Sequence, residues 1–461
     1  MRSNFKNYFL QEIEELMNKK IFGTDGVRGP ANSFPVTAET ALKLGIAVGT
    51  FFRSQVGTNR VILGKDTRRS SYMLENALTA GFTSVGMDVF LLGPVPTPAI
   101  GFLTKSMRAD LGVMISASHN PFYDNGIKFF GPNGYKLSDK SELEIENLFH
   151  SELELSNPSL IGKASRINDG LGRYTEVAKT SLPPHLRLDG LKIVIDCANG
   201  SSYKVAPEIL WELGAEVICL GNTPNGYNIN LGCGSTEPLI AADLVKRENA
   251  DLGICLDGDG DRIILIDENG EIANGDILMG LLANTLKNKG TLKGEGLVCT
   301  IMSNIALEQY LKSIGLKVFR TKVGDRYVAE KMKENNCNLG GEQSGHIIMS
   351  DYFTTGDGLT AGLQFLTSIV ETGKRASDLF KVFKPFPQIL SNIKINKNDD
   401  ILRNKNVRDS ILNVENEIGE YGRIIVRKSG TEPLIRIMVE HQDKKIARKV
   451  SAFLTSLIES Q

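Results

Sequence analysis

The sequence predicts an α/β protein in which three related α/β domains are followed by a small C-terminal α+β domain. Three apolar segments each end in polar residues, at 60–66, 192–200 and 296–304. A helical stretch and a second apolar run follow each segment, which is the strand–helix–strand order of a parallel α/β unit. These segments begin roughly 100–130 residues apart, a spacing that suits separate domains. At 461 residues the chain is also too long for one hydrophobic core.

The remaining elements follow from the spacing of apolar residues. In the three α/β units we expect helices at 77–86, 206–213 and 306–314 and second strands at 89–92, 217–220 and 317–319. In the last portion we expect strands at 389–395, 423–426 and 434–439 and helices at 407–418 and 446–457. This second order is typical of a small α+β domain.

The expected elements divide the chain into an N-terminal extension and four domains. Their predicted bounds are 1–20, 21–171, 172–271, 272–386 and 387–461. Linkers are expected near 170–173, 268–275 and 385–388. Within the extension, residues 4–17 have the spacing of a short amphipathic helix, and Met17 is an alternative start. Because every motif below follows Met17, we expect the extension to be dispensable for the chemistry.

Composition excludes several classes of protein. The formal net charge is -1, with 41% hydrophobic and 23% charged residues, which argues against a nucleic-acid or membrane-surface partner. None of the six cysteines forms a C-x-x-C pair, and three lie in apolar runs. They predict buried thiols in a reducing cytosol, not disulfides or a zinc site. No stretch resembles a signal peptide or a membrane span, so we expect a cytoplasmic protein.

The loop at 114–123 is the first candidate for chemistry. It follows an apolar strand and contains Ser116, Ser118 and His119 before a proline. Ser118 is the predicted nucleophile because it adjoins His119 and lies further into the loop; Ser116 stays an alternative, as does a plain Ser/Asn/Pro turn. Lys128, ten residues on, is predicted to serve proton transfer or phosphate binding, with a solvated surface lysine as the alternative.

The second loop alternates aspartates with glycines between two strand-like runs. Asp257, Asp259 and Asp261 can surround one hard cation, because glycines permit sharp turns and carboxylate oxygens suit magnesium. A calcium EF-hand competes, since Glu268 stands at its twelfth position. It fails because Arg262 replaces the required glycine and because strands flank the loop. A solvated acidic turn is disfavoured, since three close carboxylates repel without a cation.

Two further loops predict binding of a sugar and of a phosphate. In 340–346, glycines surround Glu342, Gln343, Ser344 and His346, a set suited to sugar hydroxyls. The alternatives are a glycine turn and a structural role for His346. In the C-terminal domain, cations, hydroxyls and a glycine amide form a candidate phosphate cradle, with a basic hairpin turn as the alternative. The cradle residues are Arg427, Ser429, Gly430, Thr431 and Arg436.

The order of these motifs resembles the α-D-phosphohexomutase superfamily from about Phe22 to the C-terminus. The motifs are Ser-Ala-Ser-His-Asn-Pro, Asp-Gly-Asp-Gly-Asp-Arg, Gly-Glu-Gln-Ser-Gly-His and Arg-Lys-Ser-Gly-Thr-Glu-Pro. Within the superfamily the chain is similar to the bacterial phosphoglucosamine mutases at 23–29, at Gln343 and at 322–327. The N-terminal extension is the one clear departure.

The resemblance implies four domains around a central cleft and a phosphoserine enzyme. Ser118 would carry the phosphoryl group, and with Asp257, Asp259 and Asp261 it would hold one magnesium ion per subunit. Independently of the resemblance, Arg28 in the glycine-braced motif at 23–29 is predicted to reach the transferring phosphoryl group, with a bent edge segment as the alternative.

The implied reaction interconverts glucosamine 6-phosphate and glucosamine 1-phosphate through a 1,6-bisphosphate, for UDP-N-acetylglucosamine and cell-wall synthesis. Glu342 and Ser344 would contact sugar hydroxyls, and the C-terminal cradle would hold the phosphate that does not react. Family members are typically homodimers. The alternatives are a phosphomannomutase/phosphoglucomutase, a phosphatase and a non-catalytic sugar-phosphate-binding protein.

Overall fold

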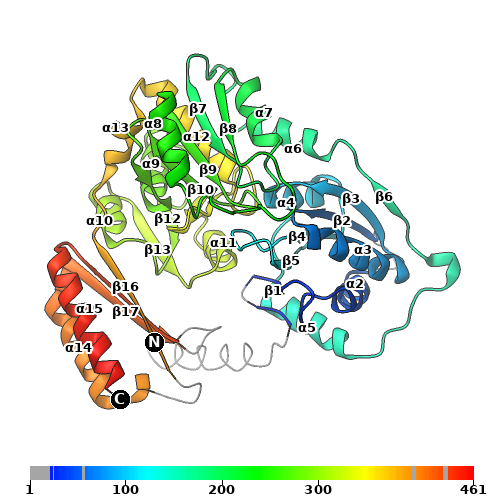
Figure 1. Cartoon of the computed structure of the whole chain (residues 1–461). Coiled ribbons are helices and arrows are strands. Elements are labelled where there is room, and N and C mark those ends of the chain that lie inside the picture. Colours follow the sequence, from blue (N-terminus) through cyan, green and yellow to red (C-terminus); the bar gives the residue numbers. More distant parts are fainter. Residues whose placement is uncertain (1–20, 24, 54–57, 396–400, 429–433, 461) are drawn as a thin grey trace. The chain divides into compact units, whose positions relative to one another are not determined.

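The computed structural model describes residues 21–23, 25–53, 58–395, 401–428 and 434–460. The predicted helix at 4–17 lies outside these residues. The chain forms two compact units, Met1–Ile301 with Phe319–Phe380 and Met302–Val318 with Lys381–Gln461. Three helix-flanked sheets and a smaller antiparallel sheet confirm the predicted α/β class (Figure 1).

The first sheet has six strands in the order β1-β5-β4-β2-β3-β6. Its strands are β1 (Val27–Pro30), β2 (Arg60–Lys65), β3 (Asp88–Pro94), β4 (Leu111–Ile115), β5 (Asp124–Phe130) and β6 (Ala164–Arg166). Its helices are α2 (Ala38–Phe52), α3 (Arg69–Ser84), α4 (Thr97–Ser106), α5 (Asp139–His150) and the 3-10 turn η1 (Pro158–Leu160). Because β2 and β4 are parallel neighbours, the loops that follow them leave from one edge of the sheet.

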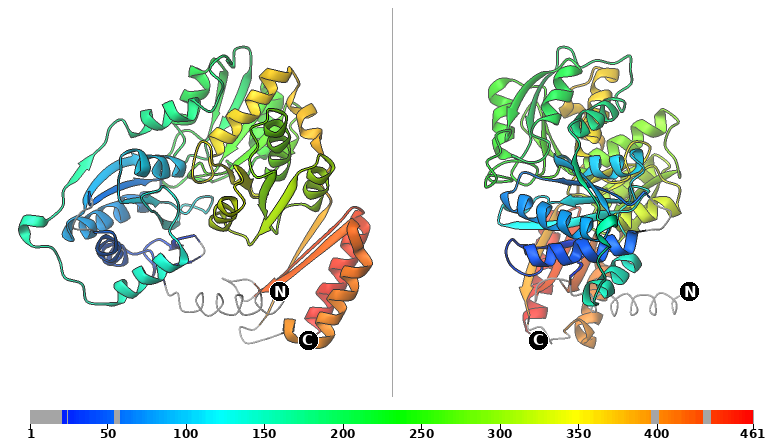
Figure 2. Two further views of the ribbon diagram at one scale, coloured as in Figure 1. Left: turned by 180° about the vertical axis from the view of Figure 1, so that it is seen from behind. Right: turned by 90° about the vertical axis from the view of Figure 1, so that its right-hand side faces the viewer.

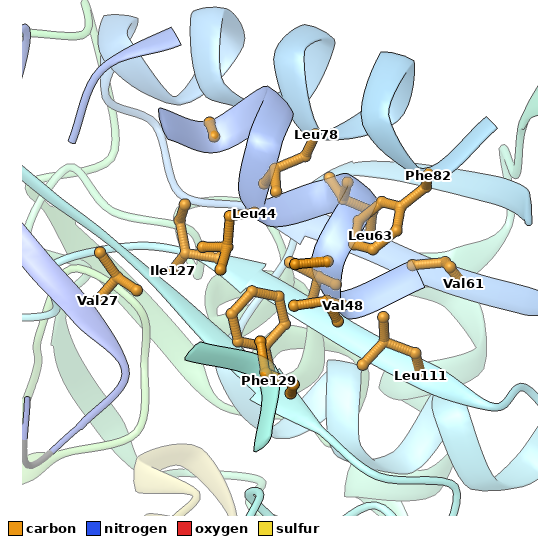
Figure 3. Packing of buried hydrophobic residues seen from close by; sticks show 14 of the residues in the cluster. Val27, Leu44, Val48, Val61, Leu63, Leu78, Phe82, Leu111, Ile127 and Phe129 are labelled. Atoms are coloured by element: carbon orange, nitrogen blue, oxygen red, sulfur yellow. The ribbon is translucent and has the colours of Figure 1, made fainter. Parts of the chain in front are cut away.

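The core of this domain fills the space between the sheet and helices α2 and α3. Figure 3 shows side chains of both helices lying with those of the strands, and all ten labelled residues are buried. The two helices approach closely at Gly45 and Gly81. A Cβ at Gly81 would lie 2.4 Å from the carbonyl oxygen of Leu42, so a larger residue there would push the helices apart.

The second sheet has the order β11-β10-β9-β7-β8, with β7, β8 and β9 parallel. Its strands are β7 (Lys192–Asp196), β8 (Glu216–Leu220), β9 (Leu252–Leu256), β10 (Ile263–Asp267) and β11 (Ile272–Ala273). The helices along this part of the chain are α6 (Gly170–Lys179), α7 (Val205–Glu212), α8 (Leu239–Glu248) and α9 (Gly275–Asn288). Strand β9 is wholly buried, and the aspartate loop follows it directly.

The third sheet has the order β13-β12-β14-β15. Its strands are β12 (Gly296–Thr300), β13 (Lys317–Thr321), β14 (Leu339–Gly341) and β15 (Ile347–Met349). The helices along this part of the chain are α11 (Asp325–Glu334), α12 (Gly358–Thr372), α13 (Ala376–Leu379) and the 3-10 turn η2 (Phe380–Val382). The predicted sugar loop joins β14 to β15, an antiparallel pair.

The second unit contains a three-stranded antiparallel sheet, ordered β16-β18-β17, with two long helices against it (Figure 2). Its elements are α10 (Ile305–Ser313), β16 (Gln388–Lys394), η3 (Ile401–Arg403), α14 (Lys405–Ile418), η4 (Gly419–Tyr421), β17 (Gly422–Lys428), β18 (Leu434–His441) and α15 (Lys444–Glu459). Ile435 and Val439 of β18 pack with Leu454 of α15. The predicted α+β character of this portion is confirmed.

Two of the predicted linkers contain regular secondary structure. Residues 170–173 form the first turn of α6, where Gly170 is buried. Residues 268–275 contain the short strand β11, which pairs with β10, and the start of α9. Helix α3 also begins at Arg69, earlier than expected. The sequence did not indicate this start, because the first turns carry few apolar residues to signal a helix.

All six cysteines are free, and five are buried as expected. Cys219 is exposed because it lies on the edge strand β8, at a position that points away from the core. Among the described residues, no helix combines the length and apolar character that crossing a membrane requires.

Candidate active site

Ser118 lies at the carboxyl end of the buried strand β4. Its side chain is almost fully buried, and its hydroxyl donates a hydrogen bond to Asp257 Oδ2 at 2.5 Å. The Nδ1 atom of His119 lies 3.4 Å from the same hydroxyl. The hydroxyl of Ser116 instead accepts the backbone N–H of Ser118 at 2.8 Å. The geometry therefore favours Ser118 over Ser116 as the reacting serine.

The three predicted metal ligands lie together. Asp257, Asp259 and Asp261 are buried, and each offers a carboxylate oxygen within 4.8 Å of the others. The second oxygens of Asp259 and Asp261 are buried and have no hydrogen-bond partner among the described residues. Burial, followed by the charges of Asp261 and Asp259, raises the pKa of Asp257 well above its usual range. A divalent cation would relieve this crowding of buried carboxylates, so the donor set fits a metal.

Lys128 points from β5 into the aspartate loop. Its Nζ lies 2.8 Å from Asp259 Oδ2, 3.3 Å from Asp261 Oδ2 and 3.6 Å from Asp25 Oδ2. Burial opposes its charge, but these three carboxylates raise the pKa of Lys128 well above its usual value. The alternative of a solvated surface lysine is wrong, since the side chain is only 2% exposed.

Burial and nearby positive charges together set the protonation of His119. Burial, then the positive charges of Arg262 and Arg28, lower the pKa of His119 to about 3, so the imidazole is neutral at physiological pH. The backbone N–H of Arg262 donates to Asp257 Oδ1 at 3.2 Å. The Arg28 guanidinium is partly exposed and donates to Asp25 Oδ2 at 3.0 Å.

The predicted sugar loop separates its polar side chains into two sets. Glu342 Oε1 accepts the backbone N–H of Gly324 at 3.1 Å, and Glu342 Oε2 accepts the hydroxyl of the exposed Ser344 at 3.1 Å. Gln343 between them is half-buried. His346 is buried apart from them, with Nε2 3.8 Å from Asp261 Oδ2. The loop therefore offers Glu342 and Ser344 as neighbours and directs His346 towards the aspartate loop.

The EF-hand alternative is wrong. Strands β9 and β10 flank the aspartate loop, as the sequence indicated. Glu268, which an EF-hand would use as a ligand, accepts hydrogen bonds from the backbone N–H and the hydroxyl of Ser377 at 3.1 and 2.5 Å.

Part of the predicted phosphate cradle is described, in the second unit. Arg427 and Arg436 lie directly opposite each other on the antiparallel strands β17 and β18. Burial and then the charge of Arg436 lower the pKa of Arg427, a pairing of cations that an anion would stabilise. The remaining predicted members, Ser429, Gly430 and Thr431, lie outside the described residues.

The sequence interpretation missed a charged network beside the site. Lys136 pairs with Asp25 and, at 2.6 Å, with Asp325 Oδ2, which lies 3.3 Å from His346 Nε2. Asp25 and Asp325 stand within the stretches 23–29 and 322–327 that carried the family resemblance, so a signal for them existed. Lys136 lies in no such motif, and only the fold brings it to the two carboxylates.

Comparisons with known proteins identify the family. Models of the phosphoglucomutase/phosphomannomutase family match all four domains: alpha/beta/alpha domain I at 19–156, domain II at 173–270, domain III at 274–386 and the C-terminal domain at 390–456. These matches agree with the three α/β sheets and the smaller antiparallel sheet described above.

Similar solved structures include a phosphoglucomutase/phosphomannomutase family protein from Burkholderia thailandensis, with a TM-score of 0.78 and 21% identity over 95% of this chain and 97% of that chain. An N-acetylphosphoglucosamine mutase from Aspergillus fumigatus has a TM-score of 0.66 and 16% identity over 96% of each chain. These two likenesses show the shared fold.

Curated relatives are closer in sequence. The phosphoglucosamine mutase of Cereibacter sphaeroides (strain ATCC 17025 / ATH 2.4.3) is 58% identical over 94% of this chain and 97% of its own length. That of Dinoroseobacter shibae is 56% identical over 96% of this chain and its full length. The chain therefore belongs to the phosphoglucosamine mutases, a group of isomerases within the phosphoglucomutase/phosphomannomutase family.

Proposed function

We propose that the chain interconverts glucosamine 6-phosphate and glucosamine 1-phosphate, with Ser118 as the residue that carries the phosphoryl group. One observation supports this most directly: the Ser118 hydroxyl is buried 2.5 Å from an aspartate of a three-carboxylate cluster. Phosphoryl transfer depends on neutralising charge and positioning the phosphate more than on covalent chemistry. A serine beside a candidate cation site and a buried lysine supplies both requirements.

The proposed cofactor is one magnesium ion per subunit. Asp257, Asp259 and Asp261 would hold it, together with a phosphate oxygen on Ser118. When bound, magnesium neutralises charge on the phosphoryl oxygens. Hard oxygen ligands favour magnesium over softer transition metals. The fold relative from Aspergillus fumigatus is in complex with GlcNAc-6P and magnesium.

The proposed reaction has two phosphoryl transfers. In the first, a hydroxyl oxygen of the sugar phosphate forms a bond to phosphorus while the bond from phosphorus to Ser118 Oγ breaks. The proton of that hydroxyl ends on Ser118 Oγ, and the product is a 1,6-bisphosphate. The bisphosphate then turns over, and its other phosphoryl group returns to Ser118. Lys128 and Arg28 would neutralise the transferring group, and the neutral His119 lies beside the reacting hydroxyl. Bisphosphate from solution would serve as the activator.

The remaining predicted residues would bind the rest of the substrate. Glu342, Gln343, Ser344 and His346 would contact the sugar. The phosphate that does not react would be held by Arg427, Ser429, Gly430, Thr431 and Arg436. We also propose a cytoplasmic homodimer that supplies UDP-N-acetylglucosamine synthesis and has no nucleic-acid or membrane partner.

A substrate panel tests the reaction. Purified protein would be given magnesium, a catalytic amount of bisphosphate and the 6-phosphates of glucosamine, glucose or mannose, and kcat/KM would be compared under one set of conditions. We expect glucosamine 6-phosphate to be preferred without complete exclusion of glucose. Equal efficiency with glucose or mannose would replace the proposal with a phosphomannomutase/phosphoglucomutase, and release of inorganic phosphate without isomerisation would indicate a phosphatase.

A mass measurement tests the phosphoserine. Intact mass of active protein should show one added phosphoryl group, and peptide mapping should place it on Ser118. Phosphate found on Ser116 alone would contradict the assignment. The proposed route would be contradicted if the protein turned over substrate but no phosphorylated protein was found, either at steady state or after pre-incubation with bisphosphate.

A further inference from the structure

We propose that Arg68 and Asn230 are positioning residues that fix the Ser118 loop in its reactive conformation, an inference that rests on the proposed role of Ser118. Neither residue belongs to the motifs that predicted the site. Together they place two side-chain nitrogen atoms on the two carbonyl oxygens that flank His119 in the loop.

The loop needs such support because of its backbone. Ser118 has φ 54, in the left-handed region that non-glycine residues rarely adopt. An unsupported serine would leave this conformation readily, since the left-handed region is unfavourable for L-residues. The hydroxyl direction depends on this backbone, because a change at Ser118 would swing Oγ away from Asp257. The Ser116 hydroxyl, which accepts the N–H of Ser118, restrains the loop from one side only.

Arg68 supplies the first donor from within the same domain. Its side chain is fully buried, and Nη2 donates to the carbonyl oxygens of Ser118 at 3.2 Å and of Asn120 at 2.5 Å. The other terminal nitrogen, Nη1, pairs with the buried carboxylate of Asp66, which also accepts the hydroxyl of Ser71. The guanidinium is thus held at both ends. Its charge is balanced by Asp66, which leaves its second nitrogen to serve the loop.

Asn230 supplies the second donor from the second α/β domain. Its Nδ2 donates to the same two carbonyl oxygens, those of Ser118 and Asn120, at 2.9 Å each. Its own backbone is anchored, because its N–H donates to the carbonyl oxygen of Ala198 at 2.9 Å. Both carbonyl groups therefore accept one bond from each donor, and the loop is held from both domains.

Sheet topology explains why these residues meet. Strands β2 and β4 are parallel neighbours, so Arg68 after β2 reaches the loop after β4. The aspartate loop approaches the same place, since a Cβ at Gly258 would lie 2.6 Å from the carbonyl oxygen of Ser118 and 2.9 Å from Asn230 Nδ2. The contact thus couples the position of the nucleophile to that of the carboxylates.

Asn230→Ala tests the proposal, with Asn249→Ala as the matched control. Both asparagines have left-handed backbones, at φ 57 and φ 51, and Asn249 is exposed at the end of α8. In the holoenzyme with magnesium, Asn230→Ala should lower kcat about 10- to 100-fold, because small displacements of reacting groups have effects of that size. KM for glucosamine 6-phosphate should stay within about twofold, since Asn230 is not proposed to touch substrate. Asn249→Ala should match wild type.

Arg68→Lys is the second variant. It keeps the charge opposite Asp66 but lacks the planar fork that reaches two acceptors, so kcat should again fall with KM unchanged. If Asn230→Ala does not fold, the kinetics of Arg68→Lys alone test the proposed positioning role. Folded variants with kcat within twofold of wild type, or a change confined to KM, would overturn the proposal. Wild-type protein that neither isomerises the substrate nor carries phosphate on Ser118 would instead overturn the proposed function.

Discussion

The loop that carries Ser118 and the loop that carries the three aspartates both follow a buried strand, but they are held in different ways. The serine loop places a non-glycine residue in the left-handed region and is held by hydrogen bonds to its carbonyl groups. The aspartate loop makes its turn at Gly260, with φ 73, where no Cβ opposes the conformation. Two of its carboxylates, those of Asp259 and Asp261, pair with the charge of Lys128.

This difference separates two kinds of sensitivity. The serine loop should respond to changes in hydrogen bonding and backbone preference, because its conformation depends on hydrogen bonds to its carbonyl groups. The aspartate loop should respond to any change in local charge, whether from a lysine or from a metal ion. Recovery of turnover by excess magnesium therefore distinguishes the loss of an aspartate from the loss of the serine.

The largest expected effect is that of Ser118→Ala. Removing the proposed nucleophile should lower kcat by about a thousandfold or more and abolish phosphorylation, while the protein stays folded. Added magnesium should not restore turnover. Steady-state kinetics and intact mass check this result, and Ser116→Ala, which should still be phosphorylated on Ser118, is the comparison variant. Full turnover in Ser118→Ala would remove the serine loop from the chemistry.

Lys128→Met should have the next largest effect. The substitution removes a buried ammonium that touches Asp259 and Asp261, so kcat should fall about 100-fold through lost charge stabilisation. Magnesium should bind at least as tightly as in wild type, because the carboxylates lose a competing cation. Calorimetric titration with magnesium measures this, and Lys105→Met on the exposed end of α4 is the control. Unchanged turnover would show that charge at this position does not matter.

Asp259→Asn should weaken the proposed metal site while leaving the serine loop intact. Loss of one anionic ligand should raise the magnesium concentration for half-maximal activity roughly tenfold or more. Excess magnesium should recover part of the turnover, unlike in Ser118→Ala. The exposed Asp243→Asn on α8 is the control, and a magnesium dependence equal to that of wild type would contradict the role of Asp259 as a ligand.

The smallest effect concerns the backbone at position 118. Ser118→Gly should be more stable than Ser118→Ala by about 1 kcal/mol, because only alanine bears the cost of the left-handed region. Urea unfolding of the two inactive variants measures the difference. At Ser141, in helix α5, the order of stability should be reversed: Ser141→Gly should be less stable than Ser141→Ala, since glycine is unfavourable in a helix. Equal stabilities at position 118 would argue that the loop relaxes without strain.

The sequence predicted most of the architecture because its signals are local. The strands that precede Asp66, Ser118 and Asp257 are short apolar runs that end in polar residues, and each lies where expected. The errors fell on segments without apolar periodicity. The first turn of α6 and the two-residue strand β11 read as linkers, because a single buried glycine or two paired residues leave no pattern.

The candidate site divides in the same way. The sequence by itself indicated Ser118 and the three aspartates, because loops rich in polar residues and glycine after apolar strands are visible in one dimension. It indicated Lys128 only through its position ten residues after Ser118. Only the tertiary structure joined Arg68 and Asn230 to Ser118, or Lys136 to Asp25 and Asp325. Arg68 and Asn230 are 50 and 112 positions from Ser118 in the sequence. Their meeting depends on the order of strands in two sheets, a property that no local pattern of residues encodes.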